Sequence, residues 1–350
     1  MAGERIKALS GAALLAALLI PFGACAEPVQ PLPRQTAPLP LDAPSVQIGN
    51  GLVTAKIYLP DMQKGFYHGT RFDQGGVIGS LAIQGQNFYG PWFDRVSPEV
   101  MDYMFTPDGI IGGPDSAICG PVEEFAPIGF EEAPAGGSFL KIGVGRLRKP
   151  DTKPYDHYRI YDIADAGLRS TLTAKDTITF VQDVKDGYRY SKTLRLIPGR
   201  PQLAIEHALT NKSGKTIATT VYDHNFLTLS PGNRDIVASF PFAIMADTRP
   251  DPALVRVDGN RFAYQRALTG KEGVSFHISG FGESPRDYDI RVGNAQTGAG
   301  MRVTGDQPLT KINVWSIRTV MAVEPYIAID LRAGATKRWT YVYTYNGPKR

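Results

Sequence analysis

Cysteine is scarce in this chain of 350 residues, which contains only Cys25 and Cys119. Cys119 is the only thiol after residue 25, so a chain shortened at its N-terminus by cleavage would have no intramolecular disulfide available. The fold must then be held together by a hydrophobic core, in contrast to small secreted domains built on disulfides. The roughly 300 remaining residues are enough to bury such a core within one domain.

A large excess of one charge sign is also missing. The chain has 38 Lys and Arg against 34 Asp and Glu, a formal charge of +4. Without residues 1–26 the balance is 36 against 33, or +3. Proteins that bind nucleic acids or anionic membranes by charge carry strongly basic surfaces. The balance therefore predicts no nucleic-acid partner and no polybasic membrane contact.

The longest apolar run of the sequence lies close to its start, at 12–20, and is too short to span a bilayer. Arg5 and Lys7 precede it, and the small residues Gly23-Ala24-Cys25-Ala26 follow Pro21. Basic, apolar and small residues in this order are typical of a secretory signal peptide. We therefore predict a signal peptide at 1–26 and a periplasmic or secreted protein.

Two processing outcomes compete for this signal. Ala24-Cys25-Ala26 fits ordinary cleavage before Glu27, whereas Gly23-Ala24-Cys25 is similar to a bacterial lipoprotein box that would acylate Cys25. Phe22 stands where lipoproteins usually have leucine, which favours ordinary cleavage. A membrane contact is therefore expected only through lipidation of Cys25.

Residues 27–45 contain six prolines and show no periodicity, which predicts an extended tether outside the fold. We expect 46–350 to form a single domain. Apolar and polar residues alternate there in many short segments, the pattern of half-buried strands. Examples are 53–59, 203–209, 218–226, 327–331 and 339–345.

Helical periodicity is scarce after the signal, with 97–105 as the only plausible short helix. Turn sequences separate the strand patterns at 186–187, 211–214, 231–233, 258–260 and 332–334. The glycine-rich stretch 109–120 lacks the features of a phosphate loop and is interpreted as a flexible loop bordering the site. The fold class predicted is all-β, as a large antiparallel β-sandwich.

Two segments carry the most specific information. A strand pattern after the turn Asn211-Lys-Ser-Gly214 ends in Tyr222-Asp-His-Asn-Phe226. Near the C-terminus, Trp315 is followed by Glu324, by the turn Leu331-Arg-Ala-Gly334 and by a final aromatic strand. In both places the chain resembles the galactose mutarotase-like proteins, comprising the aldose 1-epimerase and hexose-6-phosphate mutarotase families. The resemblance covers about 46–346 but is specific only in these two segments.

The resemblance implies a β-sandwich in which His224 is the general acid and Glu324 the general base. Interconverting sugar anomers requires one group to remove the proton of the anomeric hydroxyl and another to protonate the ring oxygen. Histidine suits this work because its reference pKa is about 6.5. No metal or organic cofactor is expected, since His68, His157 and His277 have no partner at metal-ligand spacing.

Around this pair we expect groups that bind a sugar or glycan. Aromatic rings stack on the apolar faces of sugars, and fixed polar groups bind their hydroxyls. Trp315 is the expected ring platform, Arg318 a clamp for a hydroxyl or carboxylate, and Arg71, Asp73 and Asp223 further ligands. For Arg71, a position on the surface of a hairpin is an equally weighted alternative.

One departure from the resemblance leaves the reaction open. The simple epimerases carry a second histidine in an early His-Gly motif, whereas this chain has Gly120-Pro-Val-Glu-Glu-Phe125 at the corresponding place. Glu123 or, as our chosen candidate, Glu124 would then lie at the site, although adjacent acids are more often a solvated loop edge. A pair of carboxyl groups that flank the glycosidic bond is the catalytic arrangement of glycoside hydrolases. A hydrolase or polysaccharide lyase therefore remains an alternative to an aldose 1-epimerase-like isomerase.

A non-catalytic carbohydrate-binding module is the third alternative, because it would keep the aromatic platform without needing the pair. His207 alternates with Leu203, Ile205 and Leu209 on an apolar strand face. It is therefore interpreted as a buried, hydrogen-bonded structural histidine.

Overall fold

The structure is a computed structural model that describes residues 31–349. The predicted signal peptide, its cleavage site and Cys25 lie outside the described residues. Within the described part of the chain, residues 33–349 form one compact unit. Among 31–349, no helix is long and apolar enough to cross a membrane.

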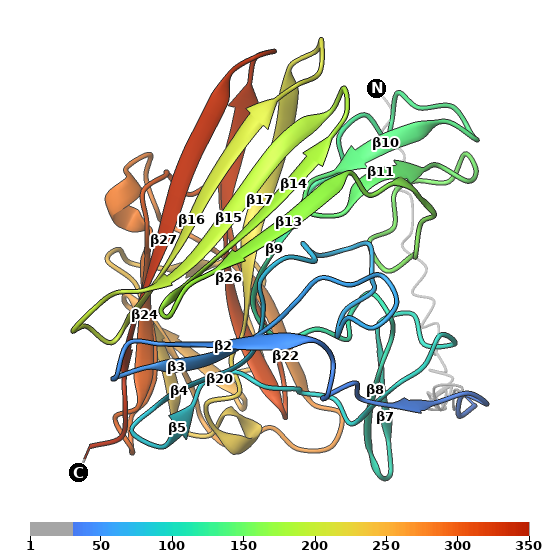
Figure 1. Ribbon diagram of the computed structural model, residues 1–350. Coiled ribbons are helices and arrows are strands. Elements are labelled where there is room, and N and C mark those ends of the chain that lie inside the picture. The colour runs from blue at the N-terminus through green and yellow to red at the C-terminus, as the bar shows by residue number, and fades with distance from the viewer. Residues whose placement is uncertain (1–30, 350) are drawn as a thin grey trace, which may run out of the picture. The chain divides into compact units, whose positions relative to one another are not determined.

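Two large antiparallel sheets dominate the unit, which confirms the predicted all-β sandwich (Figure 1). The ten-stranded sheet contains, in spatial order, β13 (Leu168–Thr173), β14 (Thr177–Val184), β15 (Tyr188–Leu196), β16 (Gln202–Asn211), β27 (Thr336–Asn346), β24 (Gly300–Gly305), β23 (Asp289–Asn294), β18 (Ile236–Ser239), β21 (Arg261–Tyr264) and β20 (Val255–Asp258). The six-stranded sheet contains β19 (Met245–Ala246), β22 (Gly273–Ser279), β25 (Lys311–Ile317), β26 (Val320–Leu331), β17 (Ile217–Phe226) and β9 (Gly120–Phe125).

Three smaller sheets accompany them, and within 31–349 the only helices are the two short 3₁₀ turns η1 (Pro231–Asn233) and η2 (Pro285–Asp287). One small sheet contains β2 (Ser45–Gly49), β3 (Thr54–Tyr58), β4 (Val77–Ile83) and β5 (Gln86–Asn87). Another contains β1 (Ala37–Pro38), β6 (Arg95–Val96), β8 (Gly109–Gly112) and β7 (Tyr103–Thr106). The third contains β10 (Ser138–Lys141), β11 (Gly145–Arg148) and β12 (Ile163–Asp165).

The main core lies between the two large sheets and follows from the alternation of side chains along their strands. On β27, the buried residues Trp339, Tyr341, Tyr343 and Tyr345 all point to the same side. They join one apolar cluster with residues of the six-stranded sheet such as Val323. The strands are therefore held face to face by burial of apolar surface, the dominant favourable contribution to folding.

Strand β17 is buried on both faces over its second half, and this feature positions the site. Its outer face carries Ala218 and Thr220, which are exposed, and then Tyr222, His224 and Phe226, which are buried. The N-terminal part of the chain covers that end of the face and forms a second apolar cluster with it. The outer face thus has an open part and a covered part, and a cavity lies between them.

The helix expected at 97–105 does not form. Residues 97–102 make turns, and Tyr103–Thr106 pair with Gly109–Gly112 as an antiparallel hairpin. Its turn contains Pro107 and Asp108 and is followed by Gly109, which has a φ of 149° and where a Cβ would clash with the Asp94 carboxylate. This turn sequence overrides the weak helical pattern because it brings the two flanking strands into register.

The proline-rich tether is also shorter than expected. Ala37–Pro38 pair with Arg95–Val96, and Ala43 is buried in the second apolar cluster. Proline is tolerated in such an edge strand because its missing N–H can face away from the ladder. The glycine-rich stretch 109–120 likewise differs from the expected loop, since it begins with β8 and buries Ile110, Ile111, Ile118 and Cys119.

Candidate active site

A cavity of about 450 Å³ lies on the outer face of the six-stranded sheet. Five strands supply its floor: Glu124 comes from β9, His224 from β17, Glu324 from β26, Asn313 from β25 and Ser275 from β22. Opposite the floor, segments outside the six-stranded sheet supply the walls, including Trp92, Asp102, Ser116 and the loop residues Tyr155, His157 and Tyr158. The volume lies within the ordinary range for small-molecule sites.

His224 and Glu324, predicted to act together, are neighbours in this cavity. Strands β17 and β26 pair antiparallel with Tyr222 opposite Tyr326, so two residues further along each strand His224 faces Glu324. The distance from His224 Nε2 to Glu324 Oε1 is 3.2 Å. Both side chains are about 5% exposed, so substrate and not bulk water would surround them once the cavity is filled.

Burial shifts the two pKa values in opposite directions. It lowers the pKa of His224 well below 6.5, assisted by the positive charge of Arg71, because burial disfavours the charged imidazolium. It raises the pKa of Glu324 to about 7, although Asn313 Nδ2 donates a hydrogen bond to Glu324 Oε2 at 2.9 Å and opposes the rise. The His224 ring also stacks on Phe226, with 3.6 Å between the ring centroids. Below about pH 7, the Glu324 carboxyl group is therefore protonated and the His224 imidazole is neutral.

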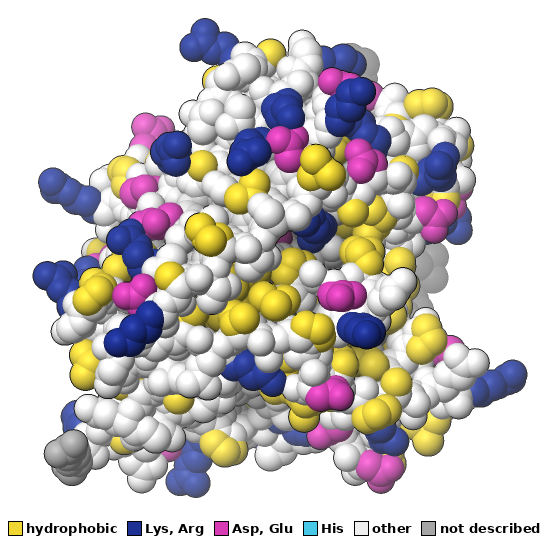
Figure 2. All heavy atoms as spheres, viewed as in Figure 1, with side chains coloured by type: hydrophobic (Ala, Val, Ile, Leu, Met, Phe, Trp, Pro, Cys, Tyr) yellow, Lys and Arg dark blue, Asp and Glu magenta, His cyan; other side chains and the backbone are white. Residues whose placement is uncertain are grey.

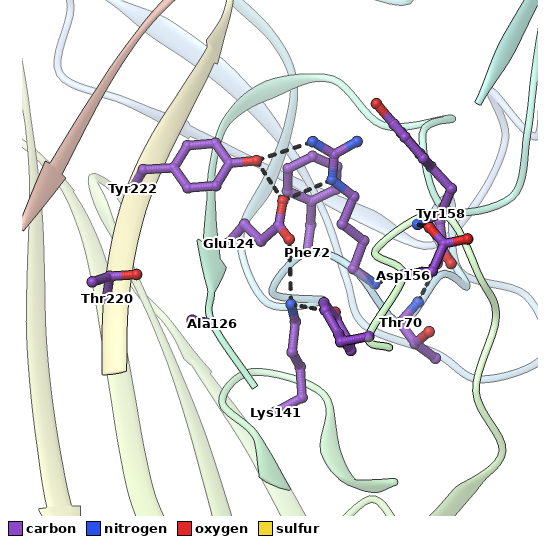
Figure 3. A network of polar contacts seen from close by, with 12 residues as sticks. Thr70, Phe72, Glu124, Ala126, Lys141, Asp156, Tyr158, Thr220 and Tyr222 are labelled. Atoms are coloured by element: carbon purple, nitrogen blue, oxygen red, sulfur yellow. Dashed lines mark hydrogen bonds and ion pairs between the residues drawn. The ribbon is translucent and has the colours of Figure 1, made fainter. Parts of the chain in front are cut away.

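A second polar group of side chains centres on Glu124 (Figure 3). Its Oε2 accepts hydrogen bonds from Arg71 Nε at 2.7 Å and from the Tyr222 hydroxyl, and Lys141 Nζ lies 3.4 Å from its Oε1. Arg71 Nη2 also donates to the Tyr222 hydroxyl at 3.0 Å. Burial alone would raise the pKa of Glu124, but the charges of Arg71 and Lys141 outweigh it and lower this pKa to about 2. Glu124 is thus an ionised, firmly held acceptor.

Aromatic rings close the other end of the cavity. Trp315 lines it, with its ring centroid 5.7 Å from that of His224 and 5.7 Å from that of Trp92. Trp92 in turn lies parallel to Phe226 at 5.8 Å. This arrangement provides a flat apolar surface beside the His224–Glu324 pair, on which the ring of a ligand can stack.

Of the residues expected at the site, His224, Glu324, Arg71, Glu124 and Trp315 line the cavity. The alternative that Glu123 and Glu124 form a solvated loop edge is wrong, because both lie buried on β9.

Three residues that were expected to bind the sugar, Asp73, Asp223 and Arg318, do not line the cavity. The Asp223 carboxylate faces the core, where it accepts a hydrogen bond from the Tyr343 hydroxyl. Asp73 is buried and its Oδ2 lies 2.9 Å from Lys192 Nζ. Arg318 Nη1 donates to the Gly270 carbonyl at 2.7 Å, away from the pair. For Asp223 the reason is the strand period of two, which sends it to the face opposite Tyr222 and His224.

The same alternation separates Glu123 from Glu124. Glu123 points between the sheets, where it contacts Lys192 and lies 2.8 Å from His207 Nε2. His207 is 3% exposed, in agreement with the structural role predicted for it. Asp73, Glu123, Lys192 and His207 thus form a buried charged cluster behind the sheet. Its compensating charges keep each ion from being unpaired in the interior.

Several residues that line the cavity were not predicted to belong to the site. Tyr155, His157 and Tyr158 come from the loop between β11 and β12, and Asn313 from β25. The crowding of aromatic and titratable residues in Pro154-Tyr-Asp-His-Tyr-Arg159 was a usable signal, because functional residues concentrate in loops. Within 31–349, no group of three or more His, Cys, Asp or Glu side chains is arranged to hold a metal ion.

No protein-family model and no curated protein matches the sequence. Solved structures do match. A galactose mutarotase-like protein from Lactobacillus casei is 14% identical, with a TM-score of 0.51 over 86% of this chain and 100% of that one. An aldose epimerase homologue from C. elegans is 12% identical, with a TM-score of 0.50 over 87% of this chain and 99% of that one. The chain therefore has the galactose mutarotase-like fold. At such identities the likeness establishes the fold and leaves the reaction to the site.

Proposed function

We propose that this protein is an aldose 1-epimerase-like mutarotase, an enzyme that interconverts the α and β anomers of a free sugar. One observation carries the proposal: an imidazole and a carboxyl group from different strands lie 3.2 Å apart in a cavity, with their pKa values shifted in opposite directions. Titratable groups tuned apart in this way are typical of acid–base sites.

In the proposed reaction the pair works with one proton. The proton moves from Glu324 to His224 across their contact, leaving a carboxylate beside an imidazolium. Glu324 then takes the proton of the anomeric hydroxyl while His224 gives its proton to the ring oxygen. The bond between the anomeric carbon and the ring oxygen breaks and the open-chain aldehyde forms. After rotation of the aldehyde, the reverse transfers close the ring as the other anomer.

The rest of the cavity suits a sugar. Trp315 offers a flat apolar face, and the Arg71–Glu124–Tyr222 group offers fixed donors and acceptors for hydroxyls. Figure 2 shows Lys and Arg mixed with Asp and Glu over one face of the molecule, with no field of a single sign. The cavity is likewise lined by side chains of both charges, among them Arg71, Lys311, Glu124 and Glu324. An uncharged sugar or glycan is therefore the proposed partner, acted on outside the cytoplasm if residues 1–26 direct export.

Polarimetry of freshly dissolved α-D-glucose and α-D-galactose tests the proposal. We expect the protein to accelerate the approach to equilibrium, and His224→Asn or Glu324→Gln to reduce kcat/KM more than about a hundredfold. His277→Asn and Glu131→Gln are matched controls at exposed positions and are expected to keep the wild-type rate. The absence of acceleration by the wild type for every sugar tried, or the release of new reducing ends from glycans, would contradict the proposal.

A further inference from the structure

A second hollow of about 670 Å³ adjoins the active-site cavity. The two share Tyr155 and Tyr158 as lining residues. Beyond these tyrosines, the lining includes Pro98, Met101, Pro114 and Ile160. We call this hollow the outer groove. Because the same two side chains border both spaces, the outer groove is the neighbouring space for a ligand that extends from the cavity past these tyrosines.

The two tyrosines are anchored at one particular end of the cavity. Lys141 Nζ donates to the Tyr155 hydroxyl at 2.9 Å, and the Arg71 guanidinium lies 5.2 Å from the centre of the Tyr158 ring. Lys141 and Arg71 are also the cations that hold Glu124. The outer groove therefore borders the cavity on the side where Glu124 lies.

The acid–base pair lies one step along the sheet from this end. Tyr222, which contacts Glu124, is two residues before His224 on β17, a spacing of about 7 Å along a strand. A pyranose ring measured with its C1 and C4 oxygens is somewhat shorter than this spacing, and its anomeric carbon C1 lies opposite C4. A sugar with C1 at the pair and its ring along β17 consequently directs O4 toward Glu124 and the two tyrosines.

From this geometry we infer that the substrate is a reducing disaccharide or longer oligosaccharide linked through O4, with its reducing-end ring in the cavity and the next ring in the outer groove. The inference rests on the proposed function, because it places C1 at the His224–Glu324 pair.

The chemistry of the outer groove fits a sugar ring. Tyrosine and proline present flat apolar surfaces, and Glu99 and Lys153 supply charged hydrogen-bonding groups to the same lining. Sugar rings combine apolar faces with a rim of hydroxyls, which such a mixed lining recognises. Met101 and Ile160 are exposed, at 62% and 47%, so they are available to a ligand and tolerant of substitution.

The test compares glucose with its 4-linked disaccharides maltose and cellobiose in mutarotation assays. We expect kcat/KM for at least one disaccharide to exceed that for glucose about tenfold. Ile160→Trp and Met101→Trp narrow the outer groove and are expected to remove most of this advantage while leaving glucose turnover within about twofold. Leu172→Trp, on the exposed strand β13 outside both hollows, is the matched control.

Equal kcat/KM for glucose and the disaccharides, or equal losses for both in the groove variants, would overturn the inference while leaving the proposed mutarotase intact. Calorimetric titration with the disaccharides separates the two ideas. If no sugar is turned over but a disaccharide binds, and Ile160→Trp weakens that binding about tenfold, the proposed function fails and the groove assignment stands. If neither disaccharide binds or is turned over, the assignment fails.

Discussion

Replacing Glu324 by glutamine is expected to change how the stability of the protein depends on pH. The pKa of the Glu324 carboxyl is raised from an ordinary 4.5 to about 7, mainly because the side chain is buried. Between these values the unfolded chain has released the proton while the folded protein keeps it. The contribution of Glu324 to the free energy of unfolding is therefore fully present below about pH 4.5 and is lost progressively as the pH rises to about 7.

The size of this loss follows from the pKa difference. One pKa unit corresponds to about 1.36 kcal/mol, so a rise from 4.5 to about 7 corresponds to about 3 kcal/mol of lost stability at pH 8. Glutamine has a similar shape but no proton to lose, so the Glu324→Gln protein is exempt from the loss. Compared with the wild type, the variant is expected to gain about 3 kcal/mol between pH 4.5 and pH 8.

Urea unfolding of both proteins at several pH values measures this difference, with the free energy of unfolding extrapolated to water. Other carboxyl groups titrate in both proteins and cancel when the two are compared. Glu131→Gln removes one exposed carboxyl and serves as the control for the substitution itself. A stability difference that stays constant within about 0.5 kcal/mol from pH 4.5 to pH 8 would show that Glu324 ionises normally. The acid–base argument for the site would then lose its basis.

Three further predictions concern the rest of the site. Glu124→Gln is expected to destabilise the protein by about 3 kcal/mol in urea unfolding, because it leaves the buried cations Arg71 and Lys141 without their counter-ion. Arg71→Met is expected to destabilise it by less, because the ion pair between Lys141 and Glu124 remains. A larger loss for Arg71→Met than for Glu124→Gln would contradict this assignment of charges. Asp223→Asn and Arg318→Ala are expected to keep the mutarotation rate within about threefold, since both side chains lie away from the cavity. A thirtyfold loss of rate in either variant would show that the substituted residue takes part in the reaction. The pH profile of kcat/KM is expected to fall as the pH rises through about 7, where the pair loses its proton; a rise to a plateau at pH 9 would show that the unprotonated pair is the active form.

The alternation of side chains along a strand explains why most residues of β17 could be placed from the sequence and why one was misplaced. It placed Tyr222, His224 and Phe226 on one face, as the structure does. The same rule places Asp223 on the opposite face, in the core between the sheets. Asp223 was expected at the site and is adjacent to His224 in the chain, but neighbouring residues of a strand point to opposite faces of the sheet.

The remaining differences come from loops and turns, whose paths depend on contacts between distant segments. Nothing local in Pro154-Tyr-Asp-His-Tyr-Arg159 determines that this loop lies beside Arg71, which is more than 80 residues earlier in the chain. At 97–105 the weak helical pattern gave way to a hairpin whose turn contains Pro107 and Asp108. The pairing of His224 with Glu324 was predictable only because the resemblance supplied both motifs at once.

Coupling between the two residues tests the central claim most directly. The exchange rate between glucose anomers would be measured by NMR for the wild type, His224→Asn, Glu324→Gln and the double variant. If the residues pass one proton between them as a unit, removing the second adds little, and the double variant is expected to be within about threefold of the slower single variant. Losses that multiply fully, with each substitution acting as strongly in the presence of the other as alone, would mean that His224 and Glu324 act independently.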